Sequence, residues 1–566
     1  MDIRRTVLWV IFSFSLLLLW NNWQMHNGRP SLFGFSQTSQ TTKPPAKEPA
    51  PTGSANVPSA AATSAAPGAA AQEKGGAAVP GGKPAPVAES QRVQVHSDVY
   101  DLTFDTKGAQ LIGAKLLKYE SIDHPNQPMT LLDESKALTY LVQTGVIGAP
   151  AGANYPTHLT PFKLMSTNTV MKGNTLDIVF EAESDNVKVV KTYTLHRGSY
   201  DIGVKNAIYN LGTSPVSPSI YLQIVRDDSD PANASHFTPH EFTGPAIYSS
   251  EDKFQKASFS DIEKGKAHYI EKANNGWIAM VQHYFATAWV PPEGAARANQ
   301  MAHLANGLYA VRTILPVGVI SPGESKVFTA QLWAGPQDQQ AMSAVAPGLD
   351  LVVDYGWLTI VAKPLFELMT LIHTLLGNWG WTIVALTLLI KAVFYPLSAA
   401  SYRSMAKMKL VGPRMKLMRE QAGGDKAKLN AAMMQLYKTE KINPLGGCLP
   451  MVVQVPVFIS LYWVLLNSVE MRGAPWVLWI HDLSAPDPWF ILPAVMMATM
   501  FLQIKLNPTP PDPTQAKIML FMPLVFGGMM FLFPAGLVLY YCFNNAVSII
   551  QQRYIMHRLD KEKEKA

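Results

Sequence analysis

The sequence predicts a polytopic α-helical membrane protein that carries a large all-β domain outside the membrane. After position 357 the chain forms a series of long apolar runs, close to the length that a helix needs to cross a bilayer. Residues 91–336 instead alternate between apolar and polar side chains in short stretches separated by Gly, Pro, Asn and Asp, which is typical of β-strands. We therefore expect one sandwich-like β domain over residues 91–340, followed by a helical membrane region.

An apolar run near the start predicts a membrane anchor over residues 7–23. Arg4 and Arg5 precede the run, and no small-x-small cleavage site follows it. We expect an uncleaved signal anchor with residues 1–6 in the cytoplasm, in preference to a cleaved signal peptide. Residues 24–90 are rich in Pro, Ala, Gly and Ser, which predicts a flexible linker outside the membrane.

The helical region predicts five more spans, making six with the anchor. These spans are residues 379–397, 447–466, 489–506, 517–533 and 537–554. Residues 351–376 carry several charged or polar side chains and are interrupted by Lys363-Pro364. We therefore expect an amphipathic helix on the outer membrane interface there, not a span.

The distribution of charge predicts the topology of these spans. Residues 401–443 contain ten Lys or Arg against three acidic residues, whereas residues 467–488 contain one Arg against three acidic residues. The tail, residues 555–566, is again basic. The positive-inside rule therefore places residues 401–443 and both termini in the cytoplasm, with residues 467–488 and the β domain on the outer side of the membrane.

Composition and motifs argue against several function classes. The net charge of +6 comes without a dense basic block interleaved with aromatics, so we expect no sequence-specific nucleic-acid binding. Both cysteines lie in apolar segments, which leaves no disulfide framework in the β domain. Walker, His-Glu-x-x-His, Gly-x-Ser-x-Gly and Cys-x-x-Cys motifs are missing from the sequence. We expect no enzyme activity, no catalytic residue, no metal and no cofactor.

Lys391 is the first candidate functional residue, because it is an isolated charge inside an apolar span. The alternative is a lysine that snorkels to the inner headgroups, and position alone does not decide between them. Thr387 lies one turn earlier, and Gln454 lies early in the next span. Polar residues of the last span complete the set: Asn544, Asn545, Ser548, Gln551 and Gln552. Together they predict either a wet cavity open to the cytoplasm or polar contacts that hold helices together.

Residues 401–443 predict an amphipathic helical hairpin with a basic outer face. A stripe of methionines marks its first arm: Met405, Met408, Met415 and Met418. Gly423-Gly424-Asp425 breaks the two arms, and Pro413 is expected to bend or divide the first arm. The methionines are suited either to varied apolar partners or simply to packing the hairpin against itself.

Several strings resemble one known family. They are Tyr395-Pro-Leu, Ser404-Met-Ala-Lys-Met, Asn443-Pro-Leu-Gly-Gly-Cys-Leu-Pro, Leu478-Trp-Ile-His-Asp-Leu-Ser, Phe533-Pro-Ala-Gly-Leu-Val-Leu-Tyr-Tyr and, in the β domain, Asn275-Gly-Trp-Ile-Ala-Met-Val-Gln-His-Tyr-Phe. In order and spacing they resemble the Gram-negative YidC insertases, which share a family with the mitochondrial and chloroplast Oxa/Alb insertases. The resemblance runs from the anchor to the tail, with only the linker generic.

The resemblance implies a periplasmic β-supersandwich and a five-helix core with a hydrophilic groove open to the cytoplasm and the lipid. It implies a membrane protein insertase and chaperone of the bacterial inner membrane, which works alone or with the Sec translocon (SecYEG and SecDF). Partners would be nascent membrane proteins, membrane lipids, and ribosomes or targeting factors at the hairpin. Lys391 is similar to the groove cation of the family, which is more often arginine, so bidentate carboxylate binding is not expected.

The resemblance also implies a substrate-contact path. Its residues are Val455 and Phe458 in the third span, Met496 in the fourth, and Tyr540 and Tyr541 in the sixth. Two other readings stay open at this point. A solute transporter would explain a charged cavity, and a secreted-type carbohydrate enzyme would explain the β domain, although His196, His236, His240 and His283 form no convincing catalytic set.

Overall fold

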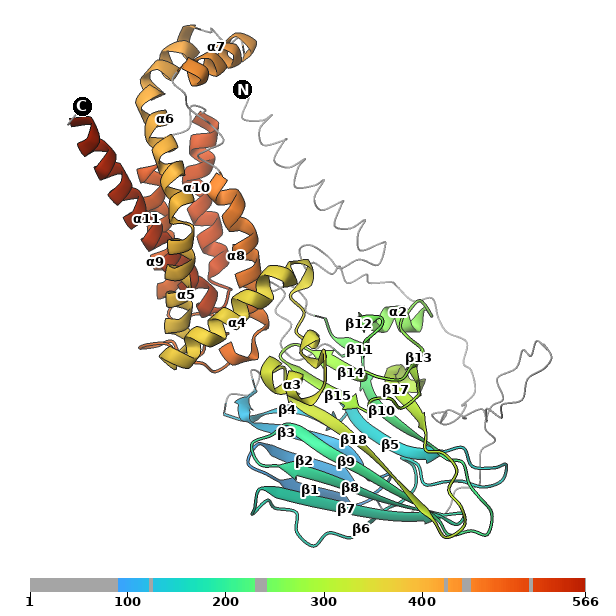
Figure 1. Ribbon diagram of the computed structural model, residues 1–566. Helices are drawn as coiled ribbons and strands as arrows, with labels where there is room; N and C mark the ends of the chain where they lie inside the picture. Colours follow the sequence, from blue (N-terminus) through green and yellow to red (C-terminus); the bar gives the residue numbers. More distant parts are fainter. Residues whose placement is uncertain are drawn as a thin grey trace, which may run out of the picture. The chain divides into compact units, whose positions relative to one another are not determined.

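The structure is a computed structural model that describes residues 90–121, 126–229, 242–421, 426–439, 449–507 and 513–564. The expected anchor at 7–23 lies outside the described residues, as does nearly all of the expected linker. The described chain divides into two compact units, a β unit that ends at Val353 and a helical unit that begins at Asp354 (Figure 1). Each unit is described by itself.

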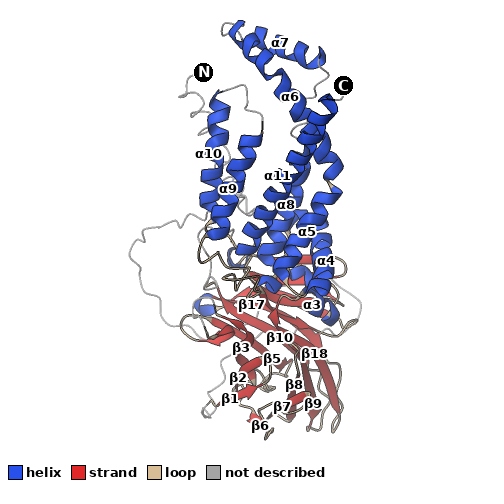
Figure 2. Cartoon of the chain, turned by 90° about the vertical axis from the view of Figure 1, so that its left-hand side faces the viewer, coloured by secondary structure: helices blue, strands red, loops and turns tan. Residues whose placement is uncertain are grey.

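The β unit consists of two nine-stranded antiparallel sheets. In spatial order the first sheet contains β1 (Arg92–His96), β2 (Tyr100–Asp105), β3 (Gln110–Glu120), β4 (Pro128–Glu134), β5 (Thr139–Ile147), β10 (Ser219–Asp227), β17 (Leu308–Pro316), β16 (Arg297–His303) and β13 (Lys272–Ala273). The second contains β12 (Lys253–Lys256), β11 (Gly244–Ser249), β14 (Trp277–Gln282), β15 (Phe285–Val290), β18 (Ser325–Pro336), β9 (Asp201–Asn210), β8 (Val187–His196), β7 (Thr175–Ser184) and β6 (Lys163–Leu164). The two sheets lie face to face (Figure 2).

The alternating sequence pattern explains this sandwich. Along β8, every second side chain from Val187 to Leu195 is buried, and the residues between them are partly exposed. Side chains cross from one sheet to the other: the Tyr140 hydroxyl donates to the Met280 carbonyl at 3.1 Å, and the Trp289 indole donates to the Gln223 carbonyl at 3.2 Å. The predicted β-sandwich is therefore confirmed.

Short elements connect the strands and lead toward the helical unit. They are α2 (Phe259–Glu263), η1 (Ala305–Gly307), α3 (Gln339–Val345), η2 (Leu349–Val352) and η3 (Gly356–Leu358). Asp338 begins α3, because its carboxylate accepts the backbone N–H of Ala341 at 3.0 Å.

Besides η3, the helical unit contains eight described helices and one short 3₁₀ turn. They are α4 (Thr359–Leu376), α5 (Trp379–Val393), α6 (Tyr395–Gln421), α7 (Lys426–Thr439), α8 (Leu449–Asn467), η5 (Val469–Met471), α9 (Ile491–Leu506), α10 (Pro513–Met530) and α11 (Ala535–Glu564). The long helix α11 packs against α5, α6, α8 and α9, so it forms the centre of the bundle (Figure 1). The helix α4 packs on α5 and α8.

Residues 351–376 differ from the expectation of one helix interrupted at Lys363-Pro364. Two 3₁₀ turns come first, and α4 then runs continuously through Pro364. The proline removes one backbone hydrogen bond, and the helix persists because its buried side chains Phe366 and Met369 pack in the unit. Exposed Ile360 and Leu375 leave an apolar outer face.

The predicted span 379–397 is also shorter in the structure. The helix α5 ends at Val393, and the chain bends by 64° into the first part of α6. Pro396 explains the change, because it occupies the first turn of α6, where its missing N–H costs nothing. Pro413 lies inside α6 and does not divide it, so that part of the expectation for the hairpin is wrong. The break at Gly423-Gly424-Asp425 lies outside the described residues.

The number of membrane spans stays a prediction when the described helices are judged by their length and composition. Within the described ranges, only α4 is long and apolar enough by itself to cross a membrane, and α5 with residues Tyr395–Met408 passes as a bent pair. The apolar segments Gln454–Asn467, Ile491–Leu506 and Lys517–Met530 are shorter. The interfacial position expected for residues 351–376 stays a prediction.

Candidate functional site

The side chain of Lys391 points into the helical bundle. Lys391 lies near the end of α5 and is only 7% exposed. Its Nζ donates to the Ser548 hydroxyl oxygen on α11 at 2.8 Å. This inward direction favours the functional interpretation over a snorkelling lysine, because the ammonium group is held against another helix.

Ser548 presents its oxygen to Lys391 in a fixed direction. Its own hydroxyl donates to the Asn544 carbonyl one turn earlier at 2.7 Å. The hydroxyl hydrogen is thus engaged within α11, and a lone pair of the oxygen faces the ammonium group. Asn544 continues the chain of contacts, since its Oδ1 accepts from Gln454 Nε2 on α8 at 2.8 Å. Lys391, Ser548, Asn544 and Gln454 are called the Lys391 cluster below.

Two longer contacts surround the Lys391 cluster. The Tyr402 hydroxyl of α6 donates to the Ser548 carbonyl at 3.4 Å, and Gln551 Nε2 donates to the Lys391 carbonyl at 3.4 Å. Both distances are at the weak end for hydrogen bonds. Polar groups from α5, α6, α8 and α11 therefore converge on one place in a largely apolar bundle.

Within the described part of the chain, the cation of the Lys391 cluster has no carboxylate partner. Among the described residues, none of the ion pairs includes Lys391. An ammonium group has three donors, and the Ser548 oxygen accepts one of them. A buried cation with only a neutral acceptor is costly, so a polar or acidic group that reached it would be bound favourably.

Thr387 lies beside the Lys391 cluster but is not part of it. It is 1% exposed, and its hydroxyl donates to the Ile383 carbonyl of its own helix at 2.7 Å. The hydroxyl of Thr387 is therefore hydrogen-bonded within α5. Its predicted place in a groove stays a prediction.

The structure brings together only part of the predicted substrate-contact path. The Phe458 ring lies 4.8 Å from the Tyr541 ring and 6.4 Å from the Tyr540 ring, measured between centroids. Val455, on the same helix, is 46% exposed, whereas Met496 on α9 is fully buried. The aromatic residues thus form one cluster between α8 and α11, and Met496 packs inside the unit.

The methionines of the hairpin pack mainly within it. Met415 is buried with Val411 of α6 and Leu436 of α7. The partly buried residues around them are Met408, Met418, Met433 and Tyr437. Met405 is partly buried and lies outside this cluster. The arrangement favours the interpretation that the stripe joins the two arms, with Leu417 and Met434 as exposed apolar side chains.

Comparison with known proteins identifies the family. The family model described as YidC periplasmic domain matches residues 92–368. The family model described as 60Kd inner membrane protein matches residues 371–563. Membrane protein insertase YidC of Bordetella petrii is 62% identical over all of both chains, and that of Paraburkholderia xenovorans is 51% identical over all of both. The chain belongs to the YidC family of membrane protein insertases.

A solved structure described as an active YidC insertase with its first transmembrane domain resolved also matches. It is 17% identical, with a TM-score of 0.39, and the match covers 82% of this chain and 92% of that one. The assignment rests on the family models and the full-length relatives. As a YidC insertase, the chain acts on nascent membrane proteins, lies in the inner membrane with a periplasmic domain, and is not an enzyme. The transporter and carbohydrate-enzyme alternatives are therefore wrong.

The sequence did not predict the tryptophan contacts at one end of this YidC core, called the aromatic end below. Trp379 stacks on His373 at 3.8 Å, and Trp381 lies edge-on to Trp476 at 5.6 Å. Trp479 and Trp489 stack at 5.4 Å in the α8–α9 connection. Tryptophans gather where a bundle meets the headgroups, so the Trp content of residues 467–488 was the available signal.

Asp487 fixes this end and was missed as well. Its carboxylate is almost fully buried. It accepts the Trp489 N–H at 3.0 Å, the Leu492 N–H at 2.7 Å and the Trp479 indole N–H at 2.9 Å. A carboxylate at the start of α9 satisfies free backbone donors and complements the helix dipole. From the sequence alone, Asp487 was only one of the three acidic residues that indicate the topology of residues 467–488.

Proposed function

We propose that the Lys391 cluster is the polar centre of a groove that receives the hydrophilic tail of an inserting membrane protein. The observation that carries this proposal is the buried ammonium group of Lys391, held by Ser548 and without a carboxylate partner among the described residues. Such a group attracts acidic side chains of the tail. It acts as an electrostatic attractor and not as a base, because no bond is made or broken.

The energetics of insertion fit this arrangement. A polar tail that crosses hydrocarbon pays the cost of dehydration, and a polar centre inside the bundle shortens the dehydrated distance. The apolar segment of the client gains about 25 cal/mol for each Å² that leaves water. The aromatic cluster of Phe458, Tyr540 and Tyr541 then offers a path for this segment between α8 and α11, without nucleotide hydrolysis.

The proposal includes a topology and a set of partners. Six spans with both termini in the cytoplasm follow from the charge distribution, with α6 and α7 on the cytoplasmic side. The aromatic end around Trp479 and Trp489 supports an opposite, periplasmic end. We infer that the basic hairpin receives ribosomes or targeting factors, and that the insertase works alone or with the Sec translocon. Lipids would contact the exposed apolar side chains of α10.

Substitution of Lys391 tests the proposal. We expect Lys391→Glu to reduce insertion of a single-span substrate with an acidic tail at least tenfold in reconstituted liposomes, because the new carboxylate repels the tail. Lys391→Arg should retain most activity, since it keeps the charge. A substrate with a neutral tail is the control and should be affected less. Equal insertion of the acidic-tailed substrate by Lys391→Glu and by the unchanged protein would refute the groove.

A further inference from the structure

The contact between α6 and α7 is rich in sulfur. Among the described residues, seven form this contact, and four of them are methionines: Met408, Met415 and Met418 of α6 and Met433 of α7. The other three are Val411, Leu436 and Tyr437. The α6 members follow one another at spacings of three and four residues, which places them on one face of the helix. These seven residues are called the hairpin contact below.

The hairpin contact holds α7 in place. Among the described elements, α6 is the one with which α7 makes its main contact. None of the ion pairs among the described residues joins the two helices. Exposed Lys407 and Lys438 instead place positive charge on both of them, and like charges on neighbouring helices repel. A change that weakens the apolar contact would therefore release α7.

Three of the four methionines are open to a small oxidant. Met408, Met418 and Met433 are only partly buried, so a peroxide can reach their sulfur atoms. Met415 is better protected, because it is 7% exposed and its Sδ accepts a hydrogen bond from the Tyr437 hydroxyl at 3.7 Å. A peroxide oxidises a thioether by two electrons: its O–O bond breaks, one oxygen is transferred to sulfur, and hydrogen peroxide leaves as water.

Oxidation would turn this apolar contact into a polar one. A methionine sulfoxide carries a strong oxygen acceptor, and burying that acceptor without a donor is costly. The hydroxyl of Tyr437 is a donor in the contact, and it already serves Met415. Leucine has a similar volume and packs in similar places, but it cannot be oxidised in this way. The chain therefore has an oxidisable residue type at positions where an inert one would also fit.

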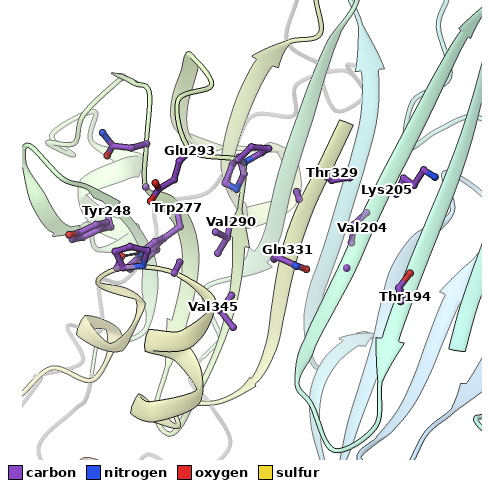
Figure 3. A pocket seen from close by; sticks show the side chains of 18 of the residues that line it. Thr194, Val204, Lys205, Tyr248, Trp277, Val290, Glu293, Thr329, Gln331 and Val345 are labelled. Atoms are coloured by element: carbon purple, nitrogen blue, oxygen red, sulfur yellow. Dashed lines mark hydrogen bonds between the residues drawn. The ribbon is translucent and has the colours of Figure 1, made fainter. Parts of the chain in front are cut away.

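The pocket in the β unit differs from the hairpin contact in this respect. Its described lining includes Thr194, Trp277 and Gln331 but neither methionine nor cysteine. Figure 3 accordingly shows no sulfur atom among the side chains drawn. A peroxide thus has several thioethers to attack in the hairpin contact and none in the lining of this pocket.

We propose that Met408, Met418 and Met433 form a reversible oxidation site, at which a peroxide releases α7 from α6 and so reduces the delivery of clients. Methionine sulfoxide reductases would reverse the change, removing the oxygen as water with electrons from a dithiol. The effect on delivery rests on the proposed function, in which the hairpin receives ribosomes or targeting factors. The oxidation and the release of α7 rest on the hairpin contact alone.

Peroxide treatment of the full chain in nanodiscs tests this proposal. Catalase removes the hydrogen peroxide, mass spectrometry then measures the oxygen added at each methionine, and trypsin cleavage after Lys438 measures the release of α7. We expect this cleavage to become at least threefold faster. The variant that combines Met408→Leu, Met418→Leu and Met433→Leu should show no acceleration. Met434→Leu is the matched control and should accelerate like the unchanged chain, because Met434 is 60% exposed and lies outside the hairpin contact.

Two results of this experiment would overturn the proposal. One is equal acceleration in the triple variant and the unchanged chain. The other is complete oxidation of Met434 while the hairpin contact stays unoxidised. If the triple variant is cleaved faster before treatment, its packing is altered, and repair of the unchanged chain decides instead. Reductases for both sulfoxide epimers should return the cleavage rate to its initial value, and a rate that stays high would exclude a reversible site.

Insertion is measured in parallel, for each variant relative to the same variant without peroxide. The unchanged chain should lose at least half of its insertion, and the triple variant should lose less. Full insertion by a chain whose α7 is released would refute the effect on delivery. Mass spectrometry and proteolysis do not depend on Lys391, whereas the insertion test with Lys391→Glu needs no oxidant. Failure of the oxidation site and failure of the proposed groove are therefore distinguishable.

Discussion

At the scale of single residues, Ser548 decides where the charge of Lys391 lies. Its hydroxyl hydrogen is engaged by the Asn544 carbonyl, so only the oxygen faces the ammonium group. A hydrogen bond to a charged group contributes about 1.5–3 kcal/mol, and its loss would let the lysine side chain turn toward other positions. Ser548 is thus a positioning residue for Lys391.

Ser548→Ala should therefore reduce insertion of an acidic-tailed substrate several-fold, whereas Ser548→Thr should retain it. Threonine keeps the hydroxyl and its bond to the preceding turn, and alanine removes both. The measurement is the ratio of acidic-tailed to neutral-tailed substrate inserted into liposomes, because a general packing defect would lower both. Identical ratios for the Ala and Thr variants would contradict this role.

Lys191 is a second buried lysine, in the β unit. It is fully buried, and its Nζ donates to the carbonyls of Gly108 and Thr144 at 2.7 Å each, above the Phe162 ring. Burial lowers the pKa of Lys191 from 10.5 to about 7. Between these two values the unfolded chain binds more protons than the folded one. The free energy of unfolding should therefore rise with pH across this window.

Lys191→Met should flatten this rise between about pH 7 and 9.5. Other groups act outside the window: burial lowers the pKa of His158 to about 4, and burial raises the pKa of Tyr193 well above its usual value. Pulse proteolysis of the β unit in urea, with the full chain in detergent, measures the midpoint at each pH. Lys188→Met, on the partly exposed face of the same strand, is the control and should keep the slope. A slope that survives in Lys191→Met would exclude Lys191 as its source.

At the scale of elements, the sequence predicted which segments are strands and which are helices better than it predicted the residues at which they begin and end. Alternation along β8 predicted a strand with one buried face, because a half-buried strand needs that period. The absence of any charged side chain from Phe394 to Leu397 gave no sign that α5 ends at Val393. The proline at 396 was the available signal.

The candidate functional site was likewise predictable only in part. The depth of Lys391 in its span was readable from the sequence, because an isolated charge in an apolar run is conspicuous. The group that accepts the hydrogen bond of Lys391 could not be predicted, because the rotation of α11 about its axis decides which of several polar side chains faces α5. The same rotation places Tyr540 in the bundle at 2% exposure. Met496 is buried for a related reason, as α9 packs on α11.

At the scale of the whole molecule, the two units should carry separable tasks. Every described partner of the Lys391 cluster belongs to the helical unit. Replacing residues 91–340 by a short linker should therefore leave most insertion of a substrate with a short acidic tail. Liposome insertion measures this, with Lys391→Glu in the shortened chain as the inactive control. Loss of short-tailed insertion in a shortened chain that still folds, judged by its thermal midpoint in detergent, would show that the core depends on the β unit.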